Sequence, residues 1–276
     1  MTFGWRTLLL TSLTWLGCGG ADVVELPSAV EEALSTEGRG IINGRDAAPG
    51  AFFYQARITG QGVLCGGALI HPQWVLTAAR CVSGFDASSG VLKVILGDHT
   101  LGRLEPSEQE HAPDRILVHP MYGPNTQDYD LALIKLATPA RLDDFVKPIA
   151  LARGGAGEQG IYLTSGWGRT DFSVEADTLQ YTALPHVPSL ACKAAYGPVM
   201  PITSRQVCAG HPSDRGDTSY SGTCLGDTGG PLVTGSGPLA LVGITTSGRR
   251  GCDSYGVFTR VSAFIDWIAQ ATGLPF

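Results

Sequence analysis

Short apolar segments separated by turn residues dominate the chain from Ile41 onward. Gly, Pro, Asn and Asp interrupt these segments, which include VLCGGALI, WVLTAA, LKVILG, LALIKL, IYLTSGW, PLALVGI and YGVFTRV. Strands at a spacing of about 8–12 residues with turn signals between them are typical of all-β sandwiches and barrels. The pattern therefore predicts an all-β fold for residues 41–276.

A helix is expected only at the C-terminal end of the chain. Val261, Phe264, Ile265 and Ile268 recur at the spacing i, i+3, i+4 and i+7, which places them on one helical face. The same spacing is not found in the segments before it. We therefore expect one amphipathic helix that closes the fold.

The first 40 residues have a different composition. Arg6 precedes a short apolar run at residues 7–16, and small residues follow it, as in a secretory signal. The run has about half of the ~20 residues that a membrane-spanning helix needs. Residues 1–18 are expected to be a signal peptide, and the acidic residues 19–40 a linker or propeptide. Two processing routes remain open: a lipoprotein signal with lipid on Cys18, or a cut after Ala21.

Composition and charge fit a folded, exported domain. Hydrophobic residues make up 43% of the chain and charged residues 16%, with a net charge of −6. No run of Lys and Arg provides the basic surface that nucleic acids require, so nucleic-acid binding is not expected. The chain has seven cysteines, and either processing route removes Cys18 from the set that can form disulfides.

Five motifs, in order, resemble the trypsin/chymotrypsin family of serine proteases. They are IING at 41–44, CGGALIHPQWVLTAARC at 65–81, DYDLALI at 128–134, TSGWGR at 164–169 and CLGDTGGP at 224–231. The resemblance implies two six-stranded antiparallel β-barrels, at about 41–150 and about 151–276, with the active site between them. It also implies three disulfides: Cys65–Cys81, Cys192–Cys208 and Cys224–Cys252. The first would close a loop of about 15 residues, worth roughly 3 kcal/mol.

The resemblance places the catalytic triad at Arg80, Asp130 and Thr228, and two of these residues depart from the family pattern. Arg80 stands where the family has histidine, and Thr228 where it has serine. A guanidinium has only donors and stays protonated in proteins, so it cannot act as the general base. The β-methyl of threonine restricts its χ1 angle and crowds a site shaped for serine. None of the six histidines falls on a triad position.

Other parts of the family site are expected at matching positions. The amides of Gly226 and Thr228 would form the oxyanion hole, and Gly222, Gly248 and Gly256 would line an open, uncharged specificity pocket suited to a large apolar side chain. Drifted loops and a collapsed pocket are the alternative. Thr246 and Ser247 stand where the family has serine and tryptophan.

Zymogen activation would pair the new amine of Ile41 with Asp227. However, Gly40 precedes Ile41, and Arg39 lies one position too early for a tryptic cut. Internal hydrogen bonds are the other way to hold Asp227.

A segment that resembles the family calcium loop runs from Leu96 to Glu108. Asp98 and Glu108 would be the carboxylate ligands, with the carbonyls of Thr100 and Arg103 completing an oxygen cage of the kind calcium prefers. An acidic turn without metal is the alternative. The family chemistry itself requires no cofactor.

The residues favour a secreted, catalytically inactive member of this family over an active one. We expect a monomer that binds a peptide or protein ligand, with a lipid on Cys18 as its only membrane contact. Arg80 and Asp130 are expected to form a bidentate ion pair, because a guanidinium fork matches a carboxylate. The pair would be either a structural element or part of a site for an anion or peptide carboxylate. A serine-type endopeptidase with aberrant catalytic residues, and a relic with no ligand, are the alternatives.

Overall fold

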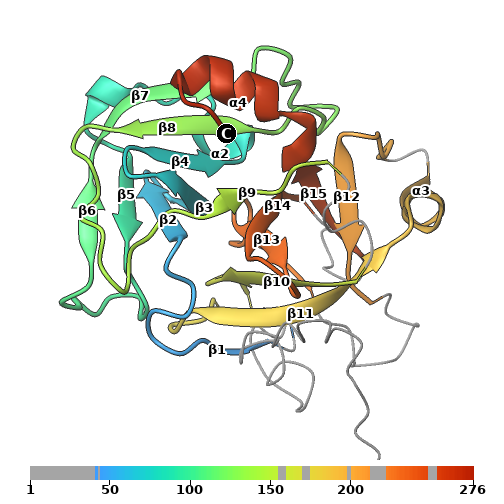
Figure 1. Ribbon diagram of the computed structural model, residues 1–276, viewed down its shortest axis with the longest axis horizontal. Helices are drawn as coiled ribbons and strands as arrows, with labels where there is room; N and C mark the ends of the chain where they lie inside the picture. The colour runs from blue at the N-terminus through green and yellow to red at the C-terminus, as the bar shows by residue number, and fades with distance from the viewer. Residues whose placement is uncertain are drawn as a thin grey trace, which may run out of the picture.

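The computed structural model describes residues 41–42, 44–154, 160–169, 175–197, 200–211, 222–247 and 254–276. The signal peptide, Cys18 and the linker before Ile41 lie outside these residues. Figure 1 shows two curled antiparallel sheets side by side, with few helices. The predicted all-β architecture of two barrel-like sheets with a C-terminal helix is confirmed.

The first sheet contains seven strands in the order β6-β5-β2-β3-β4-β8-β7. Their bounds are β2 Gln55–Gly60, β3 Val63–His71, β4 Trp74–Thr77, β5 Lys93–Leu96, β6 Gln109–His111, β7 Pro113–Val118 and β8 Ala132–Leu136. Only Ala112 separates β6 from β7. The two ends of this sheet are therefore joined through the chain, which curls it.

The second sheet contains a closed ring of six strands, because β10, β11, β12, β15, β14 and β13 pair in succession and β13 returns to β10. The short strands β1 and β9 attach to β11 and β14. The bounds are β1 Arg45–Asp46, β9 Ala150–Leu151, β10 Ile161–Gly166, β11 Gln180–Val187, β12 Gln206–Ala209, β13 Pro231–Thr234, β14 Ala240–Ser247 and β15 Gly256–Arg260. Residues 45–46 thus join this second sheet, although they precede the first in sequence.

The turn between β2 and β3 illustrates how local sequence sets the strand register. Gly60 pairs with Val63, so Gln61 and Gly62 form the two-residue turn. Both have positive φ, +44° and +78°, as a type I′ hairpin turn requires. The turn therefore aligns Cys65 opposite Ile58 and directs β3 back through the core.

The helices are short. α2 (Ala79–Val82) is a single turn after β4, α3 (Ser189–Tyr196) follows β11, and α4 (Ile265–Thr272) follows the 3₁₀ turn η3 (Val261–Ala263); a further 3₁₀ turn, η1, covers Ala87–Ser89. The expected C-terminal helix is confirmed, with Phe264 and Ile268 buried. α3 was not expected from the sequence. None of the helices in the described ranges is long and apolar enough to cross a membrane.

Two of the three expected disulfides are present in the described residues. Cys65 bonds to Cys81 and Cys192 bonds to Cys208. Cys224 is disulfide-bonded as well, and its expected partner Cys252 lies outside the described residues. The first bond ties β3 to α2, which fixes the segment that carries Arg80.

Candidate active site

The three triad positions come from different parts of the fold. Arg80 lies on α2, Asp130 directly precedes Leu131 and strand β8, and Thr228 lies in the turn before β13. The Gly66 amide donates to the Thr228 carbonyl at 2.7 Å, and the Cys81 Sγ lies 3.6 Å from that same oxygen. These contacts bring the turn of the second sheet against β3 and α2 of the first.

Asp130 is fully buried, and its carboxylate is surrounded by donors. Its Oδ1 accepts from the Arg80 backbone amide at 3.0 Å. Its Oδ2 accepts from the Arg80 Nε at 2.6 Å and from the Thr246 hydroxyl. The Thr259 hydroxyl holds the Asp130 carbonyl at 3.0 Å. The charge of Asp130 is therefore neutralised by Arg80, but the guanidinium binds through Nε alone and not through the expected two-bond fork, because the backbone amide of Arg80 takes the other carboxylate oxygen.

The side chain of Arg80 is fixed by its bond to Asp130. This side chain is 27% exposed, and its Nε donates to the Oδ2 of Asp130. Its Nη2 is buried without a hydrogen-bond partner among the described residues. Since a guanidinium has no acceptor, this position supplies positive charge and hydrogen-bond donors, but no base.

The hydroxyl of Thr228 has no hydrogen-bond partner among the described residues. Three histidines on or beside strands of the first sheet have other contacts. His99 Nε2 contacts the Ala47 carbonyl, His111 contacts Thr138, and His119 stacks on Tyr129. Among the described residues, no histidine is hydrogen-bonded to Thr228.

The expected oxyanion residues Gly226 and Thr228 lie in the turn before β13. Gly226 has a φ of +100°, which favours glycine, and a Cβ there would lie 2.9 Å from the Gly168 Cα. Within the described residues, the amides of Gly226 and Thr228 donate to no protein group. Both amides are therefore available to an oxygen of a ligand.

Asp227 is buried at 1% exposure and has no ion pair among the described residues. The Cys224 amide donates to its Oδ2 and the Gly168 amide to its Oδ1, each at 2.9 Å. Burial raises the pKa of Asp227 to about 7, against the smaller lowering by these two amides. Ile41 is buried, and the Ile42 carbonyl accepts from the Gly222 amide at 3.3 Å. In this chain, with residue 40 attached, internal hydrogen bonds hold Asp227.

Two of the three specificity-pocket glycines can be placed. Gly222 and Gly256 are buried, and a Cβ on Gly256 would lie 2.9 Å from Phe258 and 3.2 Å from Thr223. Gly248 lies outside the described residues. The pocket prediction therefore stays a prediction.

The expected calcium ligands are brought together, but a side chain of the protein contacts them. The Nε of Arg57 pairs with the Oδ2 of Asp98, and its Nη2 lies 3.9 Å from the Oε1 of Glu108. The Thr100 carbonyl accepts from the Arg103 amide at 3.1 Å. No group of three carboxylate, histidine or cysteine side chains able to hold a metal occurs in the described ranges. The residues present thus do not fit calcium.

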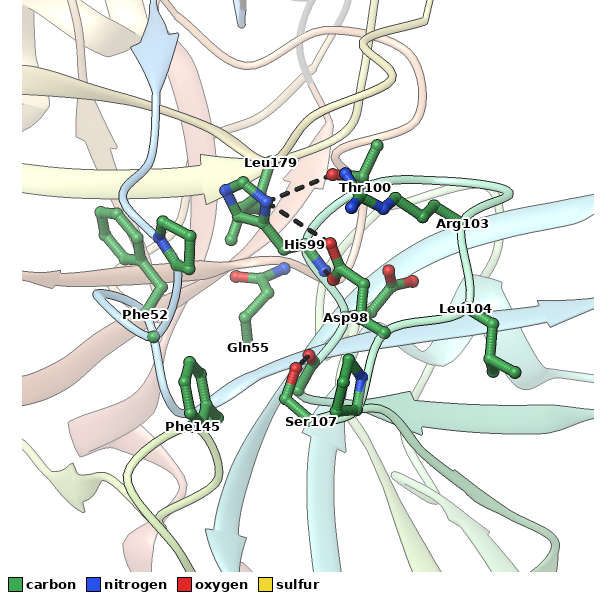
Figure 2. Close-up of a pocket in the computed structure, with 15 residues that line it drawn as sticks. Phe52, Gln55, Asp98, His99, Thr100, Arg103, Leu104, Ser107, Phe145 and Leu179 are labelled. Atoms are coloured by element: carbon green, nitrogen blue, oxygen red, sulfur yellow. Dashed lines mark hydrogen bonds and ion pairs between the residues drawn. The ribbon is translucent and has the colours of Figure 1, made fainter.

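A pocket of about 500 Å³ lies beside this loop and away from the triad positions. Figure 2 shows Phe52 and Phe145 on one side of this pocket and the loop that carries Asp98, His99 and Ser107 on the other. None of the triad residues lines it. It is therefore separate from the triad positions.

Two curled β-sheets in contact at the Thr228 turn, one of them a closed six-stranded barrel, form the fold of trypsin-like proteases. A sequence model of the trypsin family matches residues 41–268. Mannan-binding lectin serine protease 1 of Mus musculus is 34% identical over 256 residues, covering 85% of this chain and 35% of that protein. Chymotrypsin-like elastase family member 1 of Macaca fascicularis is 38% identical over 215 residues, covering 74% and 77%. Trypsin of Sus scrofa is 34% identical over 235 residues, covering 83% and 94%.

The chain belongs to the trypsin family of serine proteases. It spans about a third of the length of the mannan-binding lectin protease, and most of the length of trypsin. The family assignment made from the five motifs is confirmed.

Two residues that shape these sites were not recognised from the sequence. Thr246 was noted only as a departure from the family pattern, yet its hydroxyl donates to Asp130. No local motif indicated the role of Arg57, because it lies 41 residues from Asp98 in sequence and contacts it only through the pairing of β2 with β5. Contacts of this kind follow from strand register rather than from a local motif.

Proposed function

We propose that this protein is a secreted serine protease homologue without peptidase activity, which uses the trypsin-family cleft to bind a peptide or protein. The observation that carries this proposal is the 2.6 Å bond from the Arg80 Nε to Asp130. Acyl transfer in this family needs an imidazole that takes and returns a proton beside that carboxylate. A guanidinium in its place cannot do so.

Hydrogen-bond donors without a partner among the described residues support a binding role. The free amides of Gly226 and Thr228 can receive a carbonyl or carboxylate oxygen of a peptide. Arg80 adds a buried Nη2 with an unused hydrogen-bonding capacity among the described residues. A ligand that places an oxygen here would satisfy donors that have no partner among the described residues.

The disulfides support secretion. Such bonds persist in oxidising compartments and are rare in the cytosol, and Cys65–Cys81 and Cys192–Cys208 are both present. The signal peptide and the lipid on Cys18 stay predictions from the sequence.

Turnover of fluorogenic peptides carrying Phe, Leu, Ala or Arg before the cleaved bond tests the loss of activity. The native protein is compared with an Arg80→His/Thr228→Ser double variant, both trimmed to begin at Ile41. We expect no turnover by the native protein and at least about 100-fold more by the double variant, because general-base catalysis alone contributes about 10²–10⁴. Reverting Thr228 alone should restore little, since triad residues act as a unit.

A competition arm tests the binding role. Excess native protein is added to the double variant at low substrate concentration, where sequestration of the peptide should slow the observed turnover. Native turnover that disappears in Thr228→Ala would contradict the proposal and favour the alternative, an endopeptidase with aberrant catalytic residues. Turnover that excess native protein leaves unchanged would argue against peptide binding.

A further inference from the structure

The loop that was expected to hold calcium has a cation of its own. It leaves β5 at Gly97 and returns to β6 at Gln109, with Asp98, Glu105 and Glu108 as its carboxylates. The side chain of Asp98 is 1% exposed, and that of Glu108 is 15% exposed. A buried carboxylate must be paired to be tolerated, so the identity of its cation matters for the stability of the loop.

Arg57 provides that positive charge from the neighbouring strand. It lies in the middle of β2, opposite Ile95 on β5 and Gly66 on β3. Its guanidinium donates to Asp98 and approaches Glu108, with 15% of the side chain exposed. Because strands on both sides fix the β2 backbone, the guanidinium stays close to these two carboxylates.

The rest of the loop is held by bonds that need no metal. The His99 amide donates to the Oε2 of Glu105 at 2.8 Å, and the Ser107 hydroxyl donates to the Gly97 carbonyl at 2.8 Å. The Trp167 indole donates to the His99 carbonyl at 3.1 Å. His99 Nδ1 also lies 3.2 Å from the Thr100 hydroxyl (Figure 2).

Calcium would have to displace this arrangement. It binds six to eight oxygens at about 2.3–2.6 Å, and a guanidinium on Asp98 would repel a divalent ion at the same carboxylate. The buried Oδ1 of Asp98, which has no partner among the described residues, is the one feature that favours a metal. One free oxygen does not make an oxygen cage.

We propose that the guanidinium of Arg57 takes the place of a calcium ion in the loop of residues 97–109, which makes the order of this loop independent of calcium. Without Arg57, the carboxylates of Asp98 and Glu108 have no ion pair among the described residues. The same carboxylates then become a calcium-dependent site.

Thermal unfolding of the full chain, with EGTA or with millimolar calcium, tests this proposal. The melting temperature of the native protein should be the same in both. Arg57→Gln should melt roughly 5–10 °C lower in EGTA, and calcium should restore a large part of that loss. Arg57→Lys keeps the charge and should remain insensitive to calcium. Arg141→Gln removes an arginine that is 72% exposed and should change nothing.

Terbium luminescence, excited through tryptophan, provides a direct probe of the metal itself. Trp167 contacts the loop at His99, so a terbium ion bound there should be sensitised in Arg57→Gln and not in the native protein. Stabilisation of the native protein by calcium, together with a terbium signal, would overturn the proposal. A variant Arg57→Gln that melts like the native protein would overturn it too. If that variant does not fold, the native titration decides alone.

Discussion

Two fully buried aspartates are stabilised in different ways in this protein. Asp130 has the guanidinium of Arg80 and two further donors on its carboxylate. Asp227 has only two backbone amides and no cation among the described residues. An unpaired carboxylate in a buried site is driven towards its neutral form. Asp130 is therefore compensated by an ion pair and hydrogen bonds, whereas burial raises the pKa of Asp227.

Asp227 should make the stability of the uncut chain depend on pH. Its pKa in the folded chain, about 7, lies above its ordinary value of 3.8. The contribution of this group to stability is therefore complete below about pH 4 and is lost as the pH rises through about 7. Between about pH 5 and about pH 8, the free energy of unfolding should fall by about 2–3 kcal/mol relative to Asp227→Asn.

Urea denaturation of the two proteins at both pH values measures this difference. Subtracting the Asp227→Asn values removes the effect of every other titrating group. Parallel pH profiles for the two proteins would show that Asp227 is ionised and compensated in the folded chain, contrary to this expectation.

At the scale of elements, the contact between β3 and the Thr228 turn joins the two halves of the site. A Cβ on Gly66 would lie 2.5 Å from the Gly230 Cα and 2.7 Å from its amide nitrogen. Such distances are shorter than any ordinary van der Waals contact, and both neighbours are backbone atoms that cannot turn aside. Glycine at this point on β3 therefore lets the Gly66 amide reach the Thr228 carbonyl.

Gly66→Ala should lower the free energy of unfolding by about 3 kcal/mol, because backbone must move to admit the methyl group. Gly154→Ala is the matched control, since a Cβ there meets nothing within 4 Å. Chemical denaturation of both variants measures the contrast. Equal stabilities would mean that β3 and the Thr228 turn can move apart at little cost.

At the scale of the whole molecule, the two sheets share one hydrophobic core. The largest cluster of buried residues combines Val75 and Leu133 of the first sheet with Leu163 and Ile244 of the second. Ile268 of α4 belongs to the same cluster, and α4 lies against the first sheet although it follows the second in sequence (Figure 1). The C-terminal helix therefore ties the last strand of the second sheet to the first.

Ile268→Ala should destabilise the molecule as a unit, by about 2–5 kcal/mol, because Ile268 is completely buried. Ile265→Ala, one turn earlier on the same helix and only partly buried, should cost less. Near- and far-ultraviolet circular dichroism should give coincident unfolding curves in both variants. Separate transitions would show that the sheets unfold independently.

Much of the architecture followed from the chain itself. The spacing of apolar segments predicted β-structure, and the positions of Val261 to Ile268 predicted the last helix, because both depend on residues close together in sequence. The five motifs identified the family, which the comparison confirms, whereas the triad roles of Arg80, Asp130 and Thr228 stay predictions. The chemical conclusion at Arg80 also needed no coordinates, since a guanidinium lacks an acceptor in any environment.

Only the tertiary structure decided which groups satisfy the buried charges. Arg57 on β2 pairs with Asp98, and Thr246 on β14 donates to Asp130, and neither contact has a local signature. Asp227 has two amides for partners because Gly168, 59 residues away, packs against it. Such partners depend on strand register and on the approach of one sheet to the other, whereas the sequence alone determined the chemistry of each side chain and the periodicity of its segment.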